Sequence, residues 1–220
     1  MAFVPCVSAP PPSFAGATLV VACDGWANIA ALAADLLVSS LPLARAGYLL
    51  TPHVLPCVGN DALGDAPTGA LSTSLELFAR PGLALLQQRS PARLGAQRLL
   101  AADVLAWARG AGFTRLVALA GGEPAASPAA ALSSPFSVYS SLDGSWAGVP
   151  LSECRTPPWT LLQAAAAGGA GPEAEALVLF AAEGDNTGHA AQLAGCCVEH
   201  LGLPAVSSWR APASWSTLDG

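Results

Sequence analysis

The stretch ALVLFAAEGDNTGHAAQLAG, residues 176–195, most constrains what this chain can fold into. An apolar run typical of a buried parallel strand ends in an acidic loop with a glycine, and the chain then restarts as a helix. In an open α/β sheet, such a junction lies where ligands bind. Glu183, Asp185 and Asn186 are therefore candidate residues of an active site, of a metal site, or of the cap of a helix.

The same alternation of apolar runs and helical periodicity recurs along the chain. We expect Asn28 to cap a helix that stops before Pro42. Further helices are expected at 94–109, 159–167 and 187–201, and strands at 17–23, 46–52, 71–79, 83–89, 115–122, 136–140 and 175–182. This order predicts an α/β fold with three layers, in which helices flank a largely parallel central sheet. We expect one domain over residues 1–220, with a mobile, low-complexity segment at 123–172.

The charge and hydropathy of the chain exclude several classes of partner. Its net charge is −6 without blocks of like sign, which argues against nucleic acid. Hydrophobic residues make up 53% of the chain, but much of this is alanine. Prolines interrupt the longest uncharged stretches, 1–23 and 124–142, so we expect no membrane span. The chain has no lysine, which excludes a P-loop ATPase and a Schiff-base enzyme.

The six cysteines do not form a recognisable metal or disulfide pattern. None belongs to a C-x-x-C motif, and their spacing suits neither a zinc module nor a disulfide framework. No secretory signal is evident, so we expect free thiols in a reducing cytosol.

The chemistry-bearing residues do not assemble into a catalytic or metal-binding pattern. A second carboxylate cluster beside the acidic loop is missing, since Asp24 and Glu123 each stand alone after their strands. His189 and His200 would be roughly 16 Å apart along one helix, too far to share a metal. Cys196 and His200 could chelate, but two ligands do not make a zinc site. We therefore expect no metal and no cofactor, and favour a cap for the acidic loop.

Nucleophile and nucleotide motifs are also missing. The nearest match to G-x-S-x-G is DGSWAG, which has Asp143 in place of the first glycine, and no G-x-G-x-x-G follows a strand. The sequence therefore favours a protein that is not an enzyme. One alternative is a small α/β enzyme of the nucleoside-phosphorylase or hydrolase type that uses Glu183 or Asp185. Another is an α/β binding module of unknown partner.

Two tryptophans, Trp209 and Trp215, lie in the proline-bearing tail WRAPASW with Arg210. Tryptophans outside an amphipathic element either staple a tail to the domain or form part of an interface, where Trp and Arg are enriched. Both interpretations remain open at this point.

Several short pieces of the chain together resemble the proteasome assembly chaperone 2 family. The resemblance covers residues 3–60, 83–120 and 177–216. The matching pieces are FVPC and SAP near the N-terminus, LAADLLVSSL, RAGYL, PCVGN, LALLQQRSP, EGDN and SSWRAPASW. The chain ends in STLDG, without the hydrophobic–tyrosine–any residue tail of some family members, and its segment 123–172 looks shorter.

The resemblance implies an α/β domain without catalytic activity. It implies a heterodimer with proteasome assembly chaperone 1 that binds α-subunits of the 20S proteasome, promotes assembly of the α-ring and acts in the cytoplasm and nucleus. The candidate structural or interface residues are then Asn28, Asn60, Arg89, Glu183, Asp185, Asn186, Trp209, Arg210 and Trp215.

Overall fold

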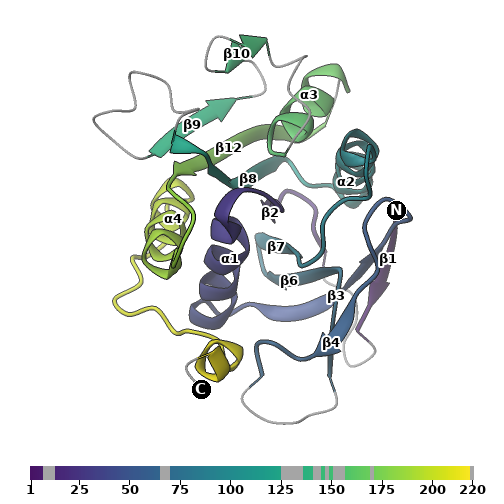
Figure 1. Cartoon of the computed structure of the whole chain (residues 1–220). Coiled ribbons are helices and arrows are strands. Elements are labelled where there is room, and N and C mark those ends of the chain that lie inside the picture. Colours follow the sequence, from purple (N-terminus) through teal and green to yellow (C-terminus); the bar gives the residue numbers. More distant parts are fainter. Residues whose placement is uncertain are drawn as a thin grey trace.

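A mixed sheet runs through the middle of the computed structural model, with helices on both of its faces (Figure 1). The structure describes residues 1–6, 13–64, 70–124, 136–140, 145–146, 149–150, 157–168 and 171–218. Within these ranges the sheet has eight strands in the order β1-β3-β6-β7-β2-β8-β12-β9. They are β1 (Ala2–Pro5), β2 (Thr18–Ala22), β3 (Ala44–Leu50), β6 (Leu75–Arg80), β7 (Leu83–Gln88), β8 (Arg115–Gly122), β9 (Phe136–Ser140) and β12 (Glu173–Phe180).

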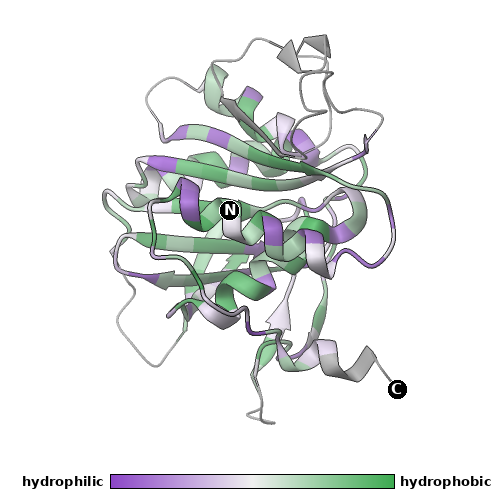
Figure 2. Ribbon diagram, turned by 90° about the vertical axis from the view of Figure 1, so that its left-hand side faces the viewer, coloured by the Kyte–Doolittle hydropathy of each residue, from purple (hydrophilic) through white to green (hydrophobic). Residues whose placement is uncertain are grey.

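The centre of the sheet is parallel and its two sides are antiparallel. Strands β7, β2, β8 and β12 run parallel, whereas β1, β3 and β6 on one side and β9 on the other are antiparallel to their neighbours. The central strands are continuous apolar runs, because both of their faces are covered. Figure 2 shows these strands as mainly hydrophobic. The predicted α/β class is confirmed, and β6 and β7, from the strands predicted at 71–79 and 83–89, form a hairpin around Pro81 and Gly82.

Two pairs of helices cover the sheet. Helices α1 (Ile29–Ser40) and α4 (Thr187–His200) pack together on one face. Helices α2 (Gln97–Ala111) and α3 (Trp159–Ala167) pack together on the other. The core accordingly divides into one cluster on each side of the sheet. Fully buried leucines dominate both clusters, and each contributes about 1.5–3 kcal/mol of hydrophobic stabilisation.

Several short elements lie outside the sequence prediction. The predicted strand 71–79 breaks at Ser74 into β5 (Leu71–Thr73) and β6, and β5 pairs with β4 (Val58–Asn60), where no strand is predicted. Strand β1, at one edge of the sheet, was not predicted either. Strands of three or four residues, largely exposed, carry no hydrophobic periodicity from which a sequence could reveal them.

Asn28 does not cap α1 in the way that the sequence predicts. It occupies the N-cap position, but its backbone is left-handed (φ 56°, ψ 14°) and its side chain makes no capping hydrogen bond. The reason is that the chain enters α1 through a 3-10 turn, η1 (Trp26–Asn28), rather than from an extended residue. Helix α2 corresponds to the helix predicted at 94–109, but it begins at Gln97 and ends at Ala111, where Gly112, with a φ of +87°, closes it.

The predicted strand 136–140 and helix 159–167 are confirmed as β9 and α3. Two short strands, β10 (Ser145–Trp146) and β11 (Val149–Pro150), pair between them. The rest of the predicted mobile segment, 125–135, 141–144, 147–148, 151–156 and 169–170, lies outside the described residues. None of the described helices is both long and apolar enough to cross a membrane.

Candidate functional site

The acidic loop after β12 folds against the start of α4, where Asp185 accepts a backbone N–H of the helix but Asn186, at the N-cap position, makes no side-chain capping hydrogen bond. The carboxylate of Asp185 accepts hydrogen bonds from the backbone N–H of Thr187, at 3.0 Å, and from its hydroxyl, at 2.8 Å. Asn186 is buried, and its side-chain amide donates to the carbonyl groups of Ala182 and Gly184. The loop is therefore folded onto itself at the start of α4.

The electrostatics of this loop do not suit acid–base chemistry. The backbone and hydroxyl groups of Thr187 hold the pKa of Asp185 below its usual value, whereas a general base near neutral pH needs a raised pKa. Glu183 and Asp185 are both exposed. Within the described part of the chain, no group of three metal-ligating side chains is present.

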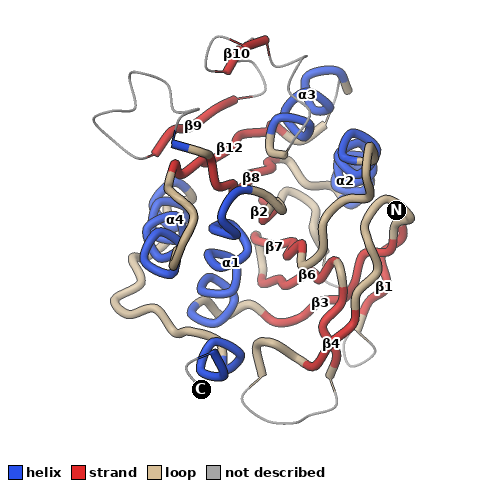
Figure 3. The backbone as a smooth tube through the Cα atoms, in the orientation of Figure 1, coloured by secondary structure: helices blue, strands red, loops and turns tan. Residues whose placement is uncertain are grey.

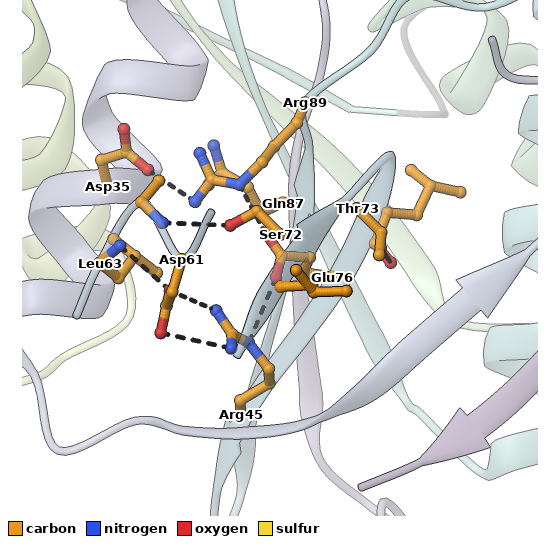
Figure 4. Close-up of polar contacts among 12 residues, drawn as sticks. Asp35, Arg45, Asp61, Leu63, Ser72, Thr73, Glu76, Gln87 and Arg89 are labelled. Atoms are coloured by element: carbon orange, nitrogen blue, oxygen red, sulfur yellow. Dashed lines mark hydrogen bonds and ion pairs between the residues drawn. The ribbon is translucent and has the colours of Figure 1, made fainter. Parts of the chain in front are cut away.

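Five side chains of alternating charge, which we call the charge network, lie in a row beside the middle of α1 (Figure 4). Arg89 Nη2 lies 3.2 Å from Asp35 Oδ1, and Arg89 Nε donates to Glu76 Oε2 at 2.5 Å. Arg45 Nε lies 3.2 Å from the other oxygen of Glu76, and Arg45 Nη2 lies 2.7 Å from Asp61 Oδ1. The network thereby joins α1, β6 and β3 with the residues that directly follow β7 and β4.

Burial makes the arginines essential to this network. Glu76 is fully buried, which raises its pKa, and hydrogen bonding and charge from Arg89 and Arg45 oppose that rise. Burial also raises the pKa of Asp35, against the charge of Arg89. Asp61 is more exposed, and hydrogen bonds from Arg45 outweigh the effect of burial and hold its pKa below its usual value. Removing Arg89 would leave the buried carboxylate of Asp35 without its cation, and removing Arg45 would leave Asp61 without its own, while Glu76 would keep one arginine in either case.

The C-terminal segment covers one end of the network. The indole N–H of Trp215 points to Asp35 Oδ2 at 3.5 Å, and the backbone N–H of Arg210 donates to Ser40 Oγ at 2.9 Å. Trp209 and Trp215 both pack against the core cluster of α1 and α4. The tryptophans therefore staple the tail to the domain, in the first of the two ways that the sequence left open.

The other end of the network anchors β4 and β5, which we call the ribbon (residues 58–60 and 71–73). Ser72 on β5 is buried, and its hydroxyl accepts a hydrogen bond from the backbone N–H of Ala62 at 3.2 Å. The register pairs Gly59 with Ser72, so the remaining side chains of the ribbon point to the opposite side. They are Val58, Asn60, Leu71 and Thr73.

Several large apolar side chains are exposed on the ribbon, on β1 and β3, and in the segment that precedes β4. We call this set the apolar surface: Val4, Leu50, Leu55, Val58 and Leu71, which are 42–71% exposed. Figure 3 shows β1, β3 and β4 on the side of the molecule away from α4. A groove of about 450 Å³ lies beside the ribbon. Its lining residues are Leu49, Leu50, Thr51, Pro52, Val54, Pro56, Cys57, Thr73, Ser74 and Arg93.

The structure divides the residues predicted from the sequence between two places. Arg89, Trp215 and Arg210 lie in or beside the charge network, and Asn60 lies on the ribbon. Asn28 and the acidic loop lie elsewhere, after the carboxyl ends of β2 and β12. The indole of Trp26 links these two ends by donating to the carbonyl of Ala181 at 2.7 Å.

Sequence reasoning missed four of the five residues of the charge network, and with them the apolar surface. The missed residues are Asp35, Arg45, Asp61 and Glu76. The one available signal was Glu76 itself, a charged residue in the middle of the strand LELFAR. Glu, like other charged residues, is almost never fully buried unless it is paired, so a central strand that contains it predicts cationic partners nearby. The sequence does not indicate which arginines these are.

The fold and site define an α/β domain with exposed apolar side chains on one side of a network of buried ion pairs. The chain belongs to the PAC2 family, which matches residues 19–209 and confirms the resemblance. It is 35% identical over 112 residues to proteasome assembly chaperone 2 of Danio rerio, and the match covers 49% of this chain and 43% of the relative. For the Homo sapiens protein of the same name, the identity is 31% over 121 residues, and the match covers 53% of this chain and 46% of the relative. The chain spans about half the length of the curated relatives it matches.

Solved structures share the fold. PbaA of Pyrococcus furiosus, described as an archaeal homolog of proteasome-assembly chaperone, is similar with a TM-score of 0.65 and 16% identity. That match covers 89% of this chain and 82% of PbaA. PbaB of the same organism, described as an archaeal proteasome activator, is similar with a TM-score of 0.59 and 14% identity. That match covers 92% of this chain and 89% of PbaB. At these identities the likeness concerns the fold alone.

Proposed function

We propose that this chain is a proteasome assembly chaperone that works through protein contacts and has no catalytic activity. In this role it forms a heterodimer with proteasome assembly chaperone 1. The heterodimer binds α-subunits of the 20S proteasome, promotes formation of the α-ring, and acts in the cytoplasm and nucleus. The observation that carries the proposal is the PAC2 family match over residues 19–209, together with relatives named proteasome assembly chaperone 2.

The apolar surface supports a role in stable complexes. Interfaces of permanent complexes are more apolar than those of transient ones. Large apolar side chains that gather on one exposed face of a chain mark a site of association. Val58 is 71% exposed and Leu50 is 56% exposed on this face, which favours a partner that covers them.

The enzymatic alternative finds no support in the acidic loop. It requires Glu183 or Asp185 to face an enclosed apolar pocket with a raised pKa. Both side chains are exposed, and the pKa of Asp185 is lowered by its hydrogen bonds to Thr187.

Co-expression with proteasome assembly chaperone 1 tests the proposal. We expect a one-to-one complex that survives size-exclusion chromatography and that captures 20S α-subunits, identified by mass spectrometry. A chain carrying Glu183→Gln and Asp185→Asn should behave in the same way, because both side chains are exposed and Asp185 serves only the start of α4. A soluble monomer that binds neither proteasome assembly chaperone 1 nor the α-subunits would contradict the proposal.

A further inference from the structure

We propose that the groove beside the ribbon binds an extended apolar segment of the companion chaperone, and that a carboxylate on this segment pairs with Arg93. The inference rests on the proposed function and adds the surface, the chemistry of the segment and the residue that recognises it. It starts from the groove of about 450 Å³ and the apolar surface around it.

The groove is formed before any partner binds. The backbone N–H of Arg93 donates to the carbonyl of His53 at 2.9 Å, and that of Leu55 donates to Pro91 at 3.0 Å. The hydroxyl of Ser74 joins the two walls, because it accepts from the N–H of Cys57 and donates to the carbonyl of Leu55, both at 2.8 Å. A groove whose walls are already ordered loses little conformational entropy when a segment enters it.

The shape and lining of the groove favour a polypeptide segment over a small molecule. Its rim is open, since Leu50, Pro52, Pro56 and Cys57 are all exposed. Small-molecule sites enclose most of their ligand and aim several polar groups at it. Here apolar side chains line one wall and continue onto the ribbon through Val58, which suits an extended segment with apolar side chains.

Arg93 determines the charge that the segment must carry. It is the only charged residue that lines the groove, it is exposed, and its side chain makes no ion pair with any residue that the structure describes. The nearby carboxylate of Asp103 is engaged instead by the hydroxyl of Thr51 at 2.6 Å. An apolar segment that covered Arg93 without supplying a carboxylate would leave a cation desolvated and unpaired, which is strongly unfavourable.

Because this face is apolar, we expect the companion chaperone rather than an α-subunit to bind in the groove. The companion is the permanent partner in the proposed function, and permanent interfaces are the more hydrophobic class. Contacts with α-subunits are made and released during assembly, which suits a more polar surface.

Cys57 provides a direct probe, because its thiol is exposed and lines the groove. The chain alone and its purified complex with proteasome assembly chaperone 1 would be treated briefly with N-ethylmaleimide. Peptide-resolved mass spectrometry would then measure the labelling of each cysteine. We expect the complex to slow the labelling of Cys57 by at least about tenfold, because a seated segment excludes the reagent. Cys196 on α4, on the far side of the molecule, serves as the internal control and should label at an unchanged rate.

Charge reversal tests the recognition itself. We expect Arg93→Glu to raise the Kd of the complex by about tenfold or more, since the variant places like charges together. Arg210→Glu is the matched control, because Arg210 is also exposed but lies at the C-terminal segment, and it should leave the Kd unchanged. Val58→Asp on the ribbon should weaken binding as well. All three variants change exposed side chains and should fold, which circular dichroism would check.

The outcomes separate the two proposals. If the complex forms normally, the labelling rate of Cys57 stays the same and Arg93→Glu does not change the Kd, this inference is overturned. The proposed function would still stand. Absence of any complex overturns both. Protection of Cys57 in the chain alone, at concentrations at which it dimerises, would identify a second copy as the occupant and overturn the assignment to the companion.

Discussion

Replacing Arg89 with methionine should destabilise the domain strongly, because it removes the cation between two buried carboxylates. The side chain donates to Glu76 at 2.5 Å and lies 3.2 Å from Asp35. Breaking a buried ion pair by removing one partner costs about 3–5 kcal/mol. Arg45 remains 3.2 Å from Glu76 and supplies part of the lost charge, so we expect about 3 kcal/mol, at the lower end of that range.

Urea denaturation followed by tryptophan fluorescence would measure this loss in the free energy of unfolding. The double variant Arg89→Met with Glu76→Gln should be less destabilised than the sum of the single variants, with a coupling of about 2 kcal/mol between the two sites. Arg210→Met is the matched control, and its cost should stay within about 0.5 kcal/mol because Arg210 is exposed.

The pH dependence of the same variant gives an independent check. Burial raises the pKa of Glu76, so the folded state holds its proton more tightly than the unfolded state does. The contribution of protonated Glu76 to the free energy of unfolding is therefore present at low pH. It is lost as the pH rises through the pKa that Glu76 has in the folded state. Without Arg89 that pKa rises further, so the destabilisation should be larger at pH 8 than at pH 5. Additive single variants, or a destabilisation that does not change with pH, would refute the reasoning.

Three further predictions concern other parts of the fold. Gly47→Ala should displace β1, because the new Cβ would lie 2.3 Å from the carbonyl oxygen of Val4; we expect a cost of about 1–3 kcal/mol and faster amide exchange in β1. Cys23 and Cys197 should resist thiol reagents in the native protein, because burial raises the pKa of each to about 12. Burial raises the pKa of Glu175, but hydrogen bonds from Arg115 and His200 hold it below its usual value. Glu175→Gln should therefore lower the free energy of unfolding at neutral pH, and this difference should vanish as pH falls below about 4.

The parts of the fold that the sequence predicts are those in which local pattern and burial agree. Strands β2, β8 and β12 are continuous apolar runs, and each is covered on both faces, so their residue types alone identify them. Asp185 was expected in a helix cap, and it does accept a backbone N–H of the following helix. Asn28 shows the limit of such rules, because it ends a 3-10 turn with a left-handed backbone and its side chain makes no capping hydrogen bond.

The charge network could not be predicted in this way, because its pairs are long-range. Arg45 and Asp61 are 16 residues apart, and Arg89 and Asp35 are 54 apart, so only the strand order brings them together. The same holds for the ribbon, whose two strands of three residues pair across a loop. Strand order depends on the whole chain, and a single short segment carries no record of it.

The network and the apolar surface form one unit. A two-stranded ribbon is at best marginally stable by itself in water. This one presents Val58 and Leu71 to solvent, so their burial does not stabilise it in the free chain. Its order derives instead from polar anchors, namely the ion pair of Asp61 with Arg45 and the buried hydroxyl of Ser72. The buried charges therefore stabilise the ribbon in the shape that a partner meets, and the entropy of ordering it is lost on folding rather than on binding.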